Sequence, residues 1–571
     1  GDFLQGTPLS DLAAHPQGWR GPNPVIAAMN ALDYDAAALG NHEFNFGLPF
    51  LARALAEARF PATCANIAAA HPGVALPAPP TVMLQRRLTD TNGHPHDLRI
   101  GVIGFVPPQI TLWDSAHLHA QFTTAGITDT ARRLLPALRA AGADLVIALA
   151  HSGIEPGPDD PGRENAALAL GKVPGIDAII AGHSHLVFPG SDHAGIAGAD
   201  TRAGTLHGTP SVMPGCAGSH LGILDLTLEH TPDGWRRHAH RAEARAVPAG
   251  PIPTAPNPDP AILRVIDRAH RHTLSMTERQ LGTTTGALHS YLARIRDDPS
   301  LRLVNAAQAA ALARAVRGTR DEGLPILSAT ACFRTGGRSG PAHFTDIAPG
   351  PLSLGDLADL YPFPNMLAGA RITGAQLRDW LERSASCYSR IVPDRHDQAL
   401  IDPTMPGHAL DTVFGVSYRI DLTRPARHAP DGTLRDPSAR RIRDLRHHGI
   451  RIADDARFLI ATNSYRAMGG GPYAPLRRAD MIALPEMSIR DVLADHITAL
   501  DTISTPRTPH WSFLPVDGAS VVFDTGPGLR NHPADIAATG AEDAGTDARG
   551  FMHLRLPLGH GAPLANPPDP A

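Results

Sequence analysis

Two histidines follow a short apolar stretch in the first half of the chain. Residues 176–181 are mostly apolar and lead directly into Gly182-His183-Ser184-His185. A stretch of this kind is typical of a buried strand, and side chains two positions apart on an extended backbone point to the same side. We therefore expect both imidazoles to reach one pocket. Because the chain has 30 histidines, this pair alone would favour a surface or structural role.

Three further stretches repeat this arrangement and change that interpretation. Residues 130–141 between them show the leucine spacing of a helix. In an α/β sheet the ligand crevice lies outside the carboxyl ends of the strands, so side chains at these ends should cluster. The ligand-type side chains are Asp2 in the opening residues, Asn41 and His42 after residues 35–39, and His151 after residues 144–150.

A cluster of this composition suits a pair of divalent metal ions. A carboxylate such as Asp2 can bridge two cations, while imidazoles and an amide oxygen complete their shells. Nitrogen and oxygen ligands without thiolate favour Zn, Mn, Fe, Co or Mg ions. Two such ions about 4 Å apart can activate water and stabilise phosphoryl oxygens. We expect His42 to be a cation near the leaving oxygen.

The order and spacing of these motifs resemble the metallophosphoesterase signature. The whole chain looks similar to the bacterial 2′,3′-cyclic-nucleotide 2′-phosphodiesterase/3′-nucleotidases, relatives of the 5′-nucleotidases. The resemblance implies that His42 is the catalytic histidine beside the phosphate. It also implies a bridging ligand at Asp2, further ligands of one metal at Asn41, His151 and His183, and a ligand of the other metal at His185.

Two departures from the family pattern affect the expected chemistry. The family signature begins with Asp-x-His on a strand upstream of Gly1, so we expect an incomplete second metal site and about one tightly bound metal. Asn45 stands where 5′-nucleotidases have an aspartate that orients the catalytic histidine. Its amide can accept a hydrogen bond from His42 but adds no charge, and so raises the imidazole pKa less. This asparagine favours the cyclic phosphodiesterase branch.

Composition sets broad limits on the protein. A chain of 571 residues predicts at least two domains, and the net charge of −5 gives no basic surface for a nucleic-acid polymer. No stretch reaches the roughly 18–20 uninterrupted apolar residues of a membrane span. The cysteines have no metal-binding spacing, and the sequence leaves open whether they are free or paired. They are Cys64, Cys216, Cys332 and Cys387.

Prolines mark the domain boundary. Residues 246–260 contain six prolines, which interrupt helices and sheets and favour an extended spacer. A helix is expected over 261–280. Residues 410–424 alternate as one strand, and residues 550–556 could add an edge strand before a disordered final dozen residues. The expected α/β architecture is an N-terminal metallophosphoesterase β-sandwich flanked by helices (1–247, first strand missing), a linker with a connecting helix (248–280), a C-terminal α/β nucleotide-binding domain (281–530) and a tail (531–571).

The C-terminal half carries candidate substrate-binding residues. An apolar run precedes Arg334, Gly336, Gly337 and Arg338, which offer guanidinium groups and close backbone approach. Two Pro- or Gly-rich loops, 359–365 and 462–471, each hold an aromatic that taken alone would be assigned to the core. The resemblance implies a base clamp of Phe363 and Tyr465, with Asn463 beside it, and stacking is worth about 1–3 kcal/mol per base.

The combined interpretation is a two-domain hydrolase. It would open 2′,3′-cyclic nucleotides to 3′-nucleotides and then release phosphate, accepting all four bases, with domain closure gating the reaction. The resemblance implies a periplasmic protein, and we expect a monomer with no membrane or nucleic-acid partner. Two alternatives remain: a 5′-nucleotidase or UDP-sugar hydrolase, and a catalytically impaired nucleotide-binding protein. The metal, the preferred base and the activity of this chain stay open.

Overall fold

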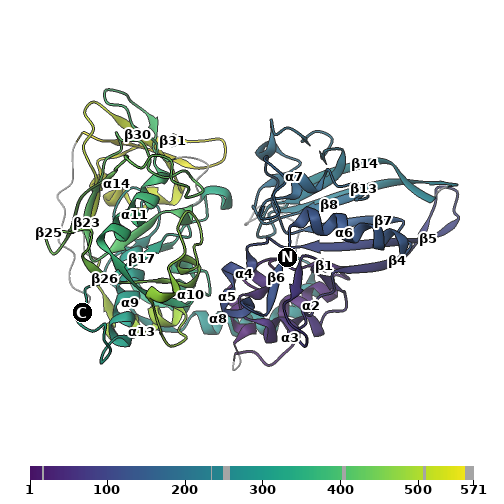
Figure 1. The fold of residues 1–571 in the computed structure, drawn as a ribbon, viewed down its shortest axis with the longest axis horizontal. Coiled ribbons are helices and arrows are strands. Elements are labelled where there is room, and N and C mark those ends of the chain that lie inside the picture. Colours follow the sequence, from purple (N-terminus) through teal and green to yellow (C-terminus); the bar gives the residue numbers. More distant parts are fainter. Residues whose placement is uncertain (16–17, 233, 249–257, 402–406, 506–508, 560–571) are drawn as a thin grey trace. The chain divides into compact units, whose positions relative to one another are not determined.

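The computed structural model describes residues 1–15, 18–232, 234–248, 258–401, 407–505 and 509–559. The chain divides into two compact units, Gly1–Leu274 and Ser275–Ala571 (Figure 1). The division falls within helix α8 (Pro260–Thr277), inside the segment expected to be a linker. Most of the proline-rich stretch, and the final dozen residues expected to be disordered, lie outside the described residues.

Unit 1 is built on an eight-stranded mixed sheet. Its order is β10-β11-β12-β8-β7-β5-β4, with β9 paired to β12, and β5, β7, β8 and β12 run parallel. Parallel strands are covered on both faces, which explains their continuous apolar sequences. The strands are β4 (Thr81–Thr89), β5 (Pro95–Phe105), β7 (Leu145–Ala150), β8 (Ala178–Ala181), β9 (Val187–Phe188), β10 (Ala199–Asp200), β11 (Thr205–Leu206) and β12 (Thr209–Pro214).

Helix α6 (Ile127–Ala140) comes between β5 and β7 in the sequence and packs against part of this sheet. Its apolar side chains Leu135 and Leu138 are buried in one core with Val146 and Ala148 of β7. Figure 1 shows the helix running alongside these strands. The helix and the strand share this core because leucines three residues apart fall on one helical face.

Strand β1 (Ala37–Ala38) does not belong to the eight-stranded sheet. It pairs in parallel with β2 (Ala62–Thr63) as a separate two-stranded sheet. Gly104 of β5 lets this pair lie against the large sheet, because a Cβ there would stand 2.3 Å from the Thr63 carbonyl oxygen. The loop after β1 therefore reaches the same region as the ends of β7 and β8, although β1 is not one of their sheet neighbours.

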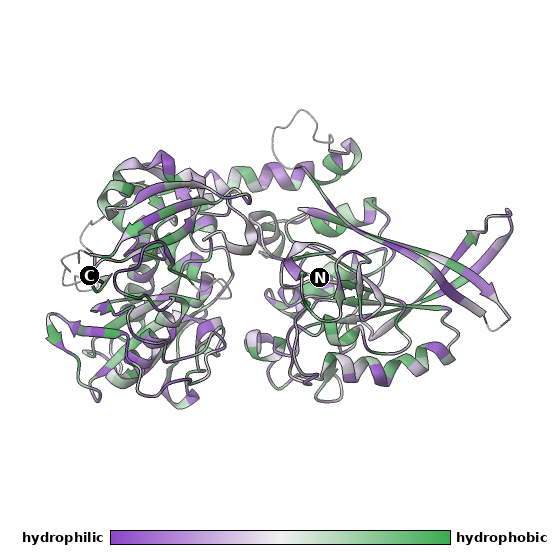
Figure 2. Cartoon of the chain, turned by 90° about the horizontal axis from the view of Figure 1, so that it is seen from above, coloured by the Kyte–Doolittle hydropathy of each residue, from purple (hydrophilic) through white to green (hydrophobic). Residues whose placement is uncertain are grey.

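Several of the remaining elements of unit 1 surround a second core, which includes Ile26, Leu51 and Phe122, whereas α7 is buried in the first core. Asn23 caps α2 by accepting hydrogen bonds from two backbone N–H groups of its first turn, as Asn does at helix N-termini. Elements in both units carry hydrophobic and hydrophilic segments (Figure 2). The elements are α1 (Pro8–Ala14), α2 (Pro24–Ala31), α3 (Leu48–Ala56), β3 (Ile67–Ala69), α4 (Ile110–Trp113), α5 (Ser115–Leu118), β6 (Phe122–Thr124), α7 (Ala167–Leu170), and the hairpin β13 (His220–Thr231) with β14 (Gly234–Ala246).

Unit 2 has a five-stranded sheet, β22-β17-β26-β20-β27, with helices α9 and α11 packed beside it. Helix α9 starts at an Asp298 cap and α11 at a capping box, so the sequence specifies where both begin. The elements are α9 (Pro299–Ala315), β17 (Ile326–Ala331), α10 (Leu354–Leu360), β20 (Leu367–Thr373), α11 (Gly374–Ser384), β22 (Asp411–Phe414), β26 (Arg457–Asn463), α12 (Ser464–Ala467), β27 (Met481–Ile482) and α13 (Ile489–Leu500).

Four smaller sheets complete the described part of unit 2. Their orders are β19-β15-β28, β25-β24-β23-β29 and β21-β30-β32-β31, and β16 pairs with β18. The strands are β15 (Gln280–Thr284), β16 (Leu288–His289), β18 (Asp346–Ile347), β19 (Gly350–Ser353), β21 (Gln398–Ala399), β23 (Ser417–Ile420), β24 (Ile442–His447), β25 (Ile450–Arg451), β28 (Thr502–Ile503), β29 (Trp511–Phe513), β30 (Ser520–Thr525), β31 (Glu542–Thr546) and β32 (Met552–Pro557).

Two strand predictions in unit 2 are corrected. Residues 410–424 form β22 and β23 in different sheets, because Gly415 between them has φ +95°, which breaks an extended chain. Residues 550–556 do not form an edge strand: β32 lies between β30 and β31. Buried Met552 and Leu554 tie this strand into the main core of the unit. The tail therefore contributes to the fold of unit 2.

Two further expectations concern chemistry and membranes. All four cysteines are free, which settles the pairing that the sequence left open. Within the described ranges, no helix combines the length and the apolar character needed to cross a bilayer.

Candidate functional site

The buried carboxylate of Glu43 holds the opening residues against the loop after β1. It accepts backbone N–H bonds from Asp2 at 2.6 Å, Phe3 at 2.7 Å and Gly40 at 2.5 Å. Only glycine fits at position 40, since a Cβ would lie 2.3 Å from Asp2 Oδ1. Burial and the nearby charge of Asp2 raise the pKa of Glu43. This residue therefore positions Asp2 beside the Asn41 loop.

Four of the predicted metal ligands lie together. The Nε2 atom of His151 is 2.9 Å from Asp2 Oδ2 and 3.1 Å from Asn41 Oδ1. His183 Nδ1 is also 3.1 Å from Asn41 Oδ1. The side chains come from the first residues and from the loops that follow β1, β7 and β8. Strand ends far apart in sequence thus deliver one carboxylate, one amide and two imidazoles to one point.

This set of donors fits a divalent cation. Ligand atoms at about 2.1 Å from a metal lie roughly 3 Å from one another, close to the separations seen. Burial lowers the pKa of His151 to about 4, so its ring is neutral at neutral pH. Burial opposes ionisation of Asp2, but the imidazoles of His151 and His42 hold the pKa of its carboxyl well below the usual range. Both groups are therefore in the protonation states that bind metals.

The orientation of His183 is fixed by two neighbours that the sequence did not identify. Its Nε2 lies 2.8 Å from Glu164 Oε1, and its ring stacks on Trp113 at 5.8 Å between centroids. A carboxylate bonded to one ring nitrogen leaves the other nitrogen, Nδ1, to face Asn41. Both partners sit in loops or short helices with no distinctive spacing to the histidine motif, so no sequence signal points to them.

The backbone around these ligands is strained. Asp2, His183 and His185 all have positive φ, at 65°, 71° and 62°, in the left-handed region that non-glycine residues rarely adopt. Such conformations cost of order 1–3 kcal/mol each and cluster at functional sites. The side chain of His185 is exposed, whereas those of the other four predicted ligands are buried or half-buried.

A hydrogen-bonded chain runs outward from His42. Its Nδ1 is 2.6 Å from Asn45 Oδ1, and the Asn45 amide donates to both carboxylate oxygens of Asp114, at 3.0 and 3.1 Å. Burial would lower the pKa of His42, but Asp2, Asn45 and Asp114 together raise it. Burial raises the pKa of Asp114. Asn45 thus lies where predicted, and a carboxylate that the sequence did not identify stands behind it.

The first group of predicted substrate-binding residues in unit 2 is the segment that contains Arg334, Gly336, Gly337 and Arg338. Arg334 forms an ion pair with Asp359 from the loop 359–365. Gly336 has φ +73°, and a Cβ there would meet the rings of Phe344 and Phe551, so only glycine fits. Gly337 has φ +58° with open space around it. The backbone of Arg338 is in a short turn, and its side chain lies outside the described set.

The two predicted clamp aromatics are each half-buried. Phe363 packs against the edge of Phe333, with 5.1 Å between ring centroids. Gly470 lies against the ring of Tyr465, since a Cβ would come within 2.4 Å of it. Asn463 is buried, and its Oδ1 accepts the backbone N–H of Arg466 to cap α12. Both aromatics keep exposed surface, whereas the Asn463 side chain is engaged within its own loop.

Comparison with known proteins gives consistent matches along the chain. Residues 1–187 match the family model of the calcineurin-like phosphoesterases, and residues 280–477 match that of the 5′-nucleotidase C-terminal domain. The chain is 40% identical, over 98% of its length and 88% of the relative's, to the 2′,3′-cyclic-nucleotide 2′-phosphodiesterase/3′-nucleotidase of Yersinia enterocolitica.

Two further matches differ in the share of the matched protein that this chain covers. The trifunctional nucleotide phosphoesterase protein YfkN of Bacillus subtilis is 36% identical over 92% of this chain, which spans only 36% of that protein. The structure of a putative 5′-nucleotidase from Staphylococcus aureus superposes with a TM-score of 0.67 at 21% identity, covering 90% of this chain and 89% of its own. These matches confirm the predicted α/β fold class with its phosphoesterase and nucleotidase-type domains.

Proposed function

The chain belongs to the 2′,3′-cyclic-nucleotide 2′-phosphodiesterase/3′-nucleotidase family, and from that premise we propose how its residues divide the work. The protein is a metal-dependent hydrolase that converts 2′,3′-cyclic nucleotides to 3′-nucleotides and these to nucleosides and phosphate. The observation that supports the assignment of residues is the convergence of Asp2, Asn41, His151 and His183, with donor atoms 2.9–3.1 Å apart.

We assign those four side chains to one divalent ion, and His185 with Asp2 to a second. Bound divalent ions supply Lewis-acid stabilisation of phosphoryl oxygens and activate water at neutral pH. The residues themselves hold the site in shape: Glu43 anchors Asp2, and Glu164 orients His183. The number and identity of the ions are part of this proposal.

His42 is proposed to carry the proton that the leaving oxygen needs. The Asn45 amide donates to Asp114, which fixes Oδ1 as the atom that faces His42. Because that oxygen only accepts, Nδ1 carries a proton and Nε2 becomes the position that gives or takes one. The raised pKa of His42 keeps the ring cationic to higher pH, which suits a group beside developing negative charge.

The base is proposed to bind in unit 2 between Phe363 and Tyr465. Arg334, which pairs with Asp359 of the Phe363 loop, and the Gly336–Gly337 turn are proposed as further contacts. The rings of Phe363 and Tyr465 are partly exposed, which supports stacking on a base, and stacking tolerates any base. We extend the proposal to a monomeric, periplasmic protein, on the family resemblance. Light scattering of the purified protein and release by osmotic shock test these two points.

The decisive experiment compares phosphate release from 2′,3′-cyclic AMP, 3′-AMP and 5′-AMP. We expect turnover of the first two, loss of it with a chelator, and recovery after addition of a divalent metal. The 5′ isomer is the matched control, since it differs only in the position of the phosphate. Preference for 5′-AMP would select a 5′-nucleotidase, and nucleotide binding without phosphate release would select a binding protein.

A further inference from the structure

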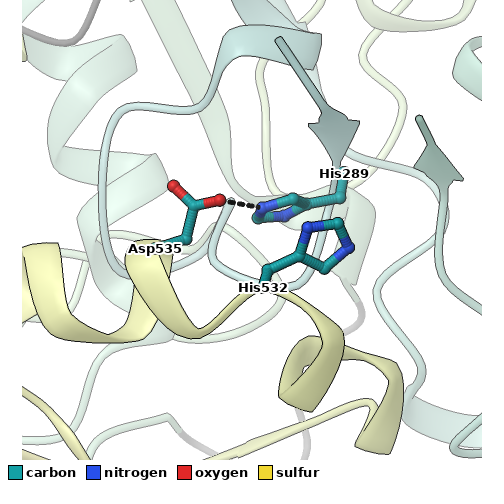
Figure 3. A group of neighbouring side chains, drawn as sticks. All are labelled: His289, His532 and Asp535. Carbon is teal, nitrogen blue, oxygen red and sulfur yellow. Dashed lines mark hydrogen bonds and ion pairs between the residues drawn. The ribbon is translucent and has the colours of Figure 1, made fainter. Parts of the chain in front are cut away.

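A second group of potential metal ligands lies in unit 2, apart from the residues assigned to catalysis. His289, His532 and Asp535 each offer one ligand atom, and all three atoms lie within 4.8 Å of one another (Figure 3). His289 belongs to the short strand β16 and is almost fully buried. His532 and Asp535 stand at the start of helix α14 (Pro533–Thr539).

The three side chains already face one another. Asp535 Oδ2 is 3.1 Å from His289 Nε2, and the rings of His289 and His532 have centroids 4.5 Å apart. Figure 3 shows the His532 ring beside that of His289, with Asp535 directed at His289. Arg296 donates to the other carboxylate oxygen, Oδ1, at 2.8 Å. This bond fixes the carboxylate and keeps it ionised, since Arg296 and His289 lower the Asp535 pKa against the effect of burial.

A second carboxylate, that of Asp346, orients the His532 ring. Its Nε2 lies 2.8 Å from Asp346 Oδ1, and the hydroxyl of Tyr291 donates to Asp346 Oδ2 at 2.9 Å. A histidine that donates from Nε2 to a carboxylate presents its lone pair at Nδ1. Carboxylates that orient metal-binding histidines in this way are a recurring feature of zinc sites.

His289 supplies an independent observation. Its Nδ1 is buried and has no hydrogen-bond partner in the described part of the chain, whereas its Nε2 faces Asp535. The buried Asp298 carboxyl lies within electrostatic range of this ring, and its Oδ2 also lacks a partner. The hydrogen bonds of the cluster therefore leave a buried ring nitrogen unsatisfied, which calls for an explanation.

We propose that His289 Nε2, His532 Nδ1 and Asp535 Oδ2 bind a divalent transition-metal ion such as Zn²⁺, with solvent as the fourth ligand. Two imidazoles and a carboxylate form a donor set that zinc accepts, and tetrahedral ligands lie about 3.3 Å apart, a short side-chain movement from the present spacing. The ion joins β16 to helix α14, whose ligands are 246 residues apart in sequence. Since the unfolded chain cannot assemble these ligands, the ion stabilises unit 2.

The test measures zinc bound by the full-length chain in a His151→Ala background, which weakens the catalytic site. We compare that protein with the same protein carrying His532→Ala, using elemental analysis after zinc loading and desalting. His553→Ala is the matched control, because His553 is a half-buried histidine beside two aspartates of the same unit. We expect His532→Ala to lose one zinc per chain, and His553→Ala to lose none.

Two graded variants extend the comparison. Asp346→Ala removes only the partner that orients His532 and should weaken zinc binding about 10–100-fold. Asp535→Asn should lose the ion while keeping side-chain volume, and serves if His532→Ala fails to fold. In an otherwise wild-type chain, His532→Ala should leave kcat on bis(p-nitrophenyl) phosphate unchanged, which separates this site from the proposed function. Equal zinc content in the His532, Asp535 and parent proteins, with no zinc-dependent rise in Tm, would overturn the proposal.

Discussion

The amide of Asn45 lies between His42, the proposed catalytic histidine, and the carboxylate of Asp114. His42 bonds to Asn45, and Asn45 bonds to Asp114, so the negative charge acts on the imidazole from one residue further away. Distance weakens the charge's effect, yet the burial of this chain lowers the local dielectric and preserves part of it. The arrangement orients His42 through the Asn45 amide and raises the imidazole pKa less than a directly bonded carboxylate would.

Replacing His42 tests its role as an acid that does not bind metal. We expect His42→Ala to lower kcat about 10²–10³-fold, because charge developing on the leaving oxygen loses its proton donor. Elemental analysis should give the same metal content as in the wild-type protein. Metal loss in the variant would show that His42 is a ligand instead.

The hydrogen-bonded chain predicts a change in the pH profile. The pKa of His42 is raised in the folded protein, so activity that needs its protonated form is complete below that pKa and falls as pH rises through it. Asn45→Ala removes one group that raises this pKa, and the alkaline limb of kcat against pH should move to lower pH.

Asp114→Asn provides the companion measurement, since it removes the charge behind Asn45 and keeps the size of the side chain. It should move the alkaline limb in the same direction as Asn45→Ala. An unchanged limb in both variants, with kcat reduced uniformly across pH, would mean that the chain only packs the site.

Among the elements of unit 2, helix α10 and strand β26 are each followed by a segment that carries a partly exposed aromatic ring. Phe363 follows α10, and Tyr465 is the second residue of α12, which comes directly after β26. The buried ion pair of Arg466 and Asp411 anchors the second loop. Arg466 Nε and Nη2 each lie 2.9 Å from an oxygen of the Asp411 carboxylate. Rigid elements therefore fix where each loop starts, and the rings remain available for stacking.

Removing either ring should affect nucleotides alone. We expect Phe363→Ala and Tyr465→Ala each to raise KM for 3′-AMP roughly tenfold, in line with a stacking loss of about 1–3 kcal/mol. kcat/KM for bis(p-nitrophenyl) phosphate, which has no base, should stay within twofold of the wild-type value. Equal losses on both substrates would contradict the clamp.

At the scale of the whole molecule, each unit has its own buried cores. Those of unit 1 gather residues up to Met213, and those of unit 2 start at Leu288. Within unit 2, Asp297 accepts from His510 Nδ1 at 2.6 Å and from Arg302 Nε at 2.8 Å, joining the start of α9 to the segment before β29. Despite burial, His510 and Arg302 lower the pKa of Asp297. Separate cores predict that a defect in one unit need not unfold the other.

Asp297→Asn tests this independence and has a defined pH dependence. A lowered folded-state pKa gives stability that is complete above the ordinary aspartate pKa of about 3.9 and is lost as pH falls through the folded value. At neutral pH we expect the variant to lower the free energy of unfolding of unit 2, measured by calorimetry, by about 3 kcal/mol. The difference from wild type should shrink below about pH 4, and the unit 1 transition should not move.

One transition that shifts as a whole, or a difference that is constant with pH, would contradict this account. His151→Ala is the matched change in unit 1. It should remove the rise in Tm that added metal gives the unit 1 transition while leaving the transition affected by Asp297→Asn unchanged.

The loops that hold the proposed metal ligands could be located from local sequence, because apolar strands that end in Asn, His or Gly-His carry their signal in a few adjacent residues. The side chains of Asn41, His151 and His183 lie together after β1, β7 and β8. The family matches confirm the fold class. The positions of β7, β8 and α6 followed from local apolar spacing in the same way.

Tertiary packing brings together side chains that are distant in sequence, both behind those loops and in the histidine cluster of unit 2. Asp114 is 69 residues from Asn45, and His289 is 246 residues from Asp535. The separate β1–β2 sheet and the interior place of β32 were also decided by pairing between distant segments. Hydrogen bonds between such residues depend on how strands and helices pack, and packing leaves no periodicity or spacing in the sequence around either partner.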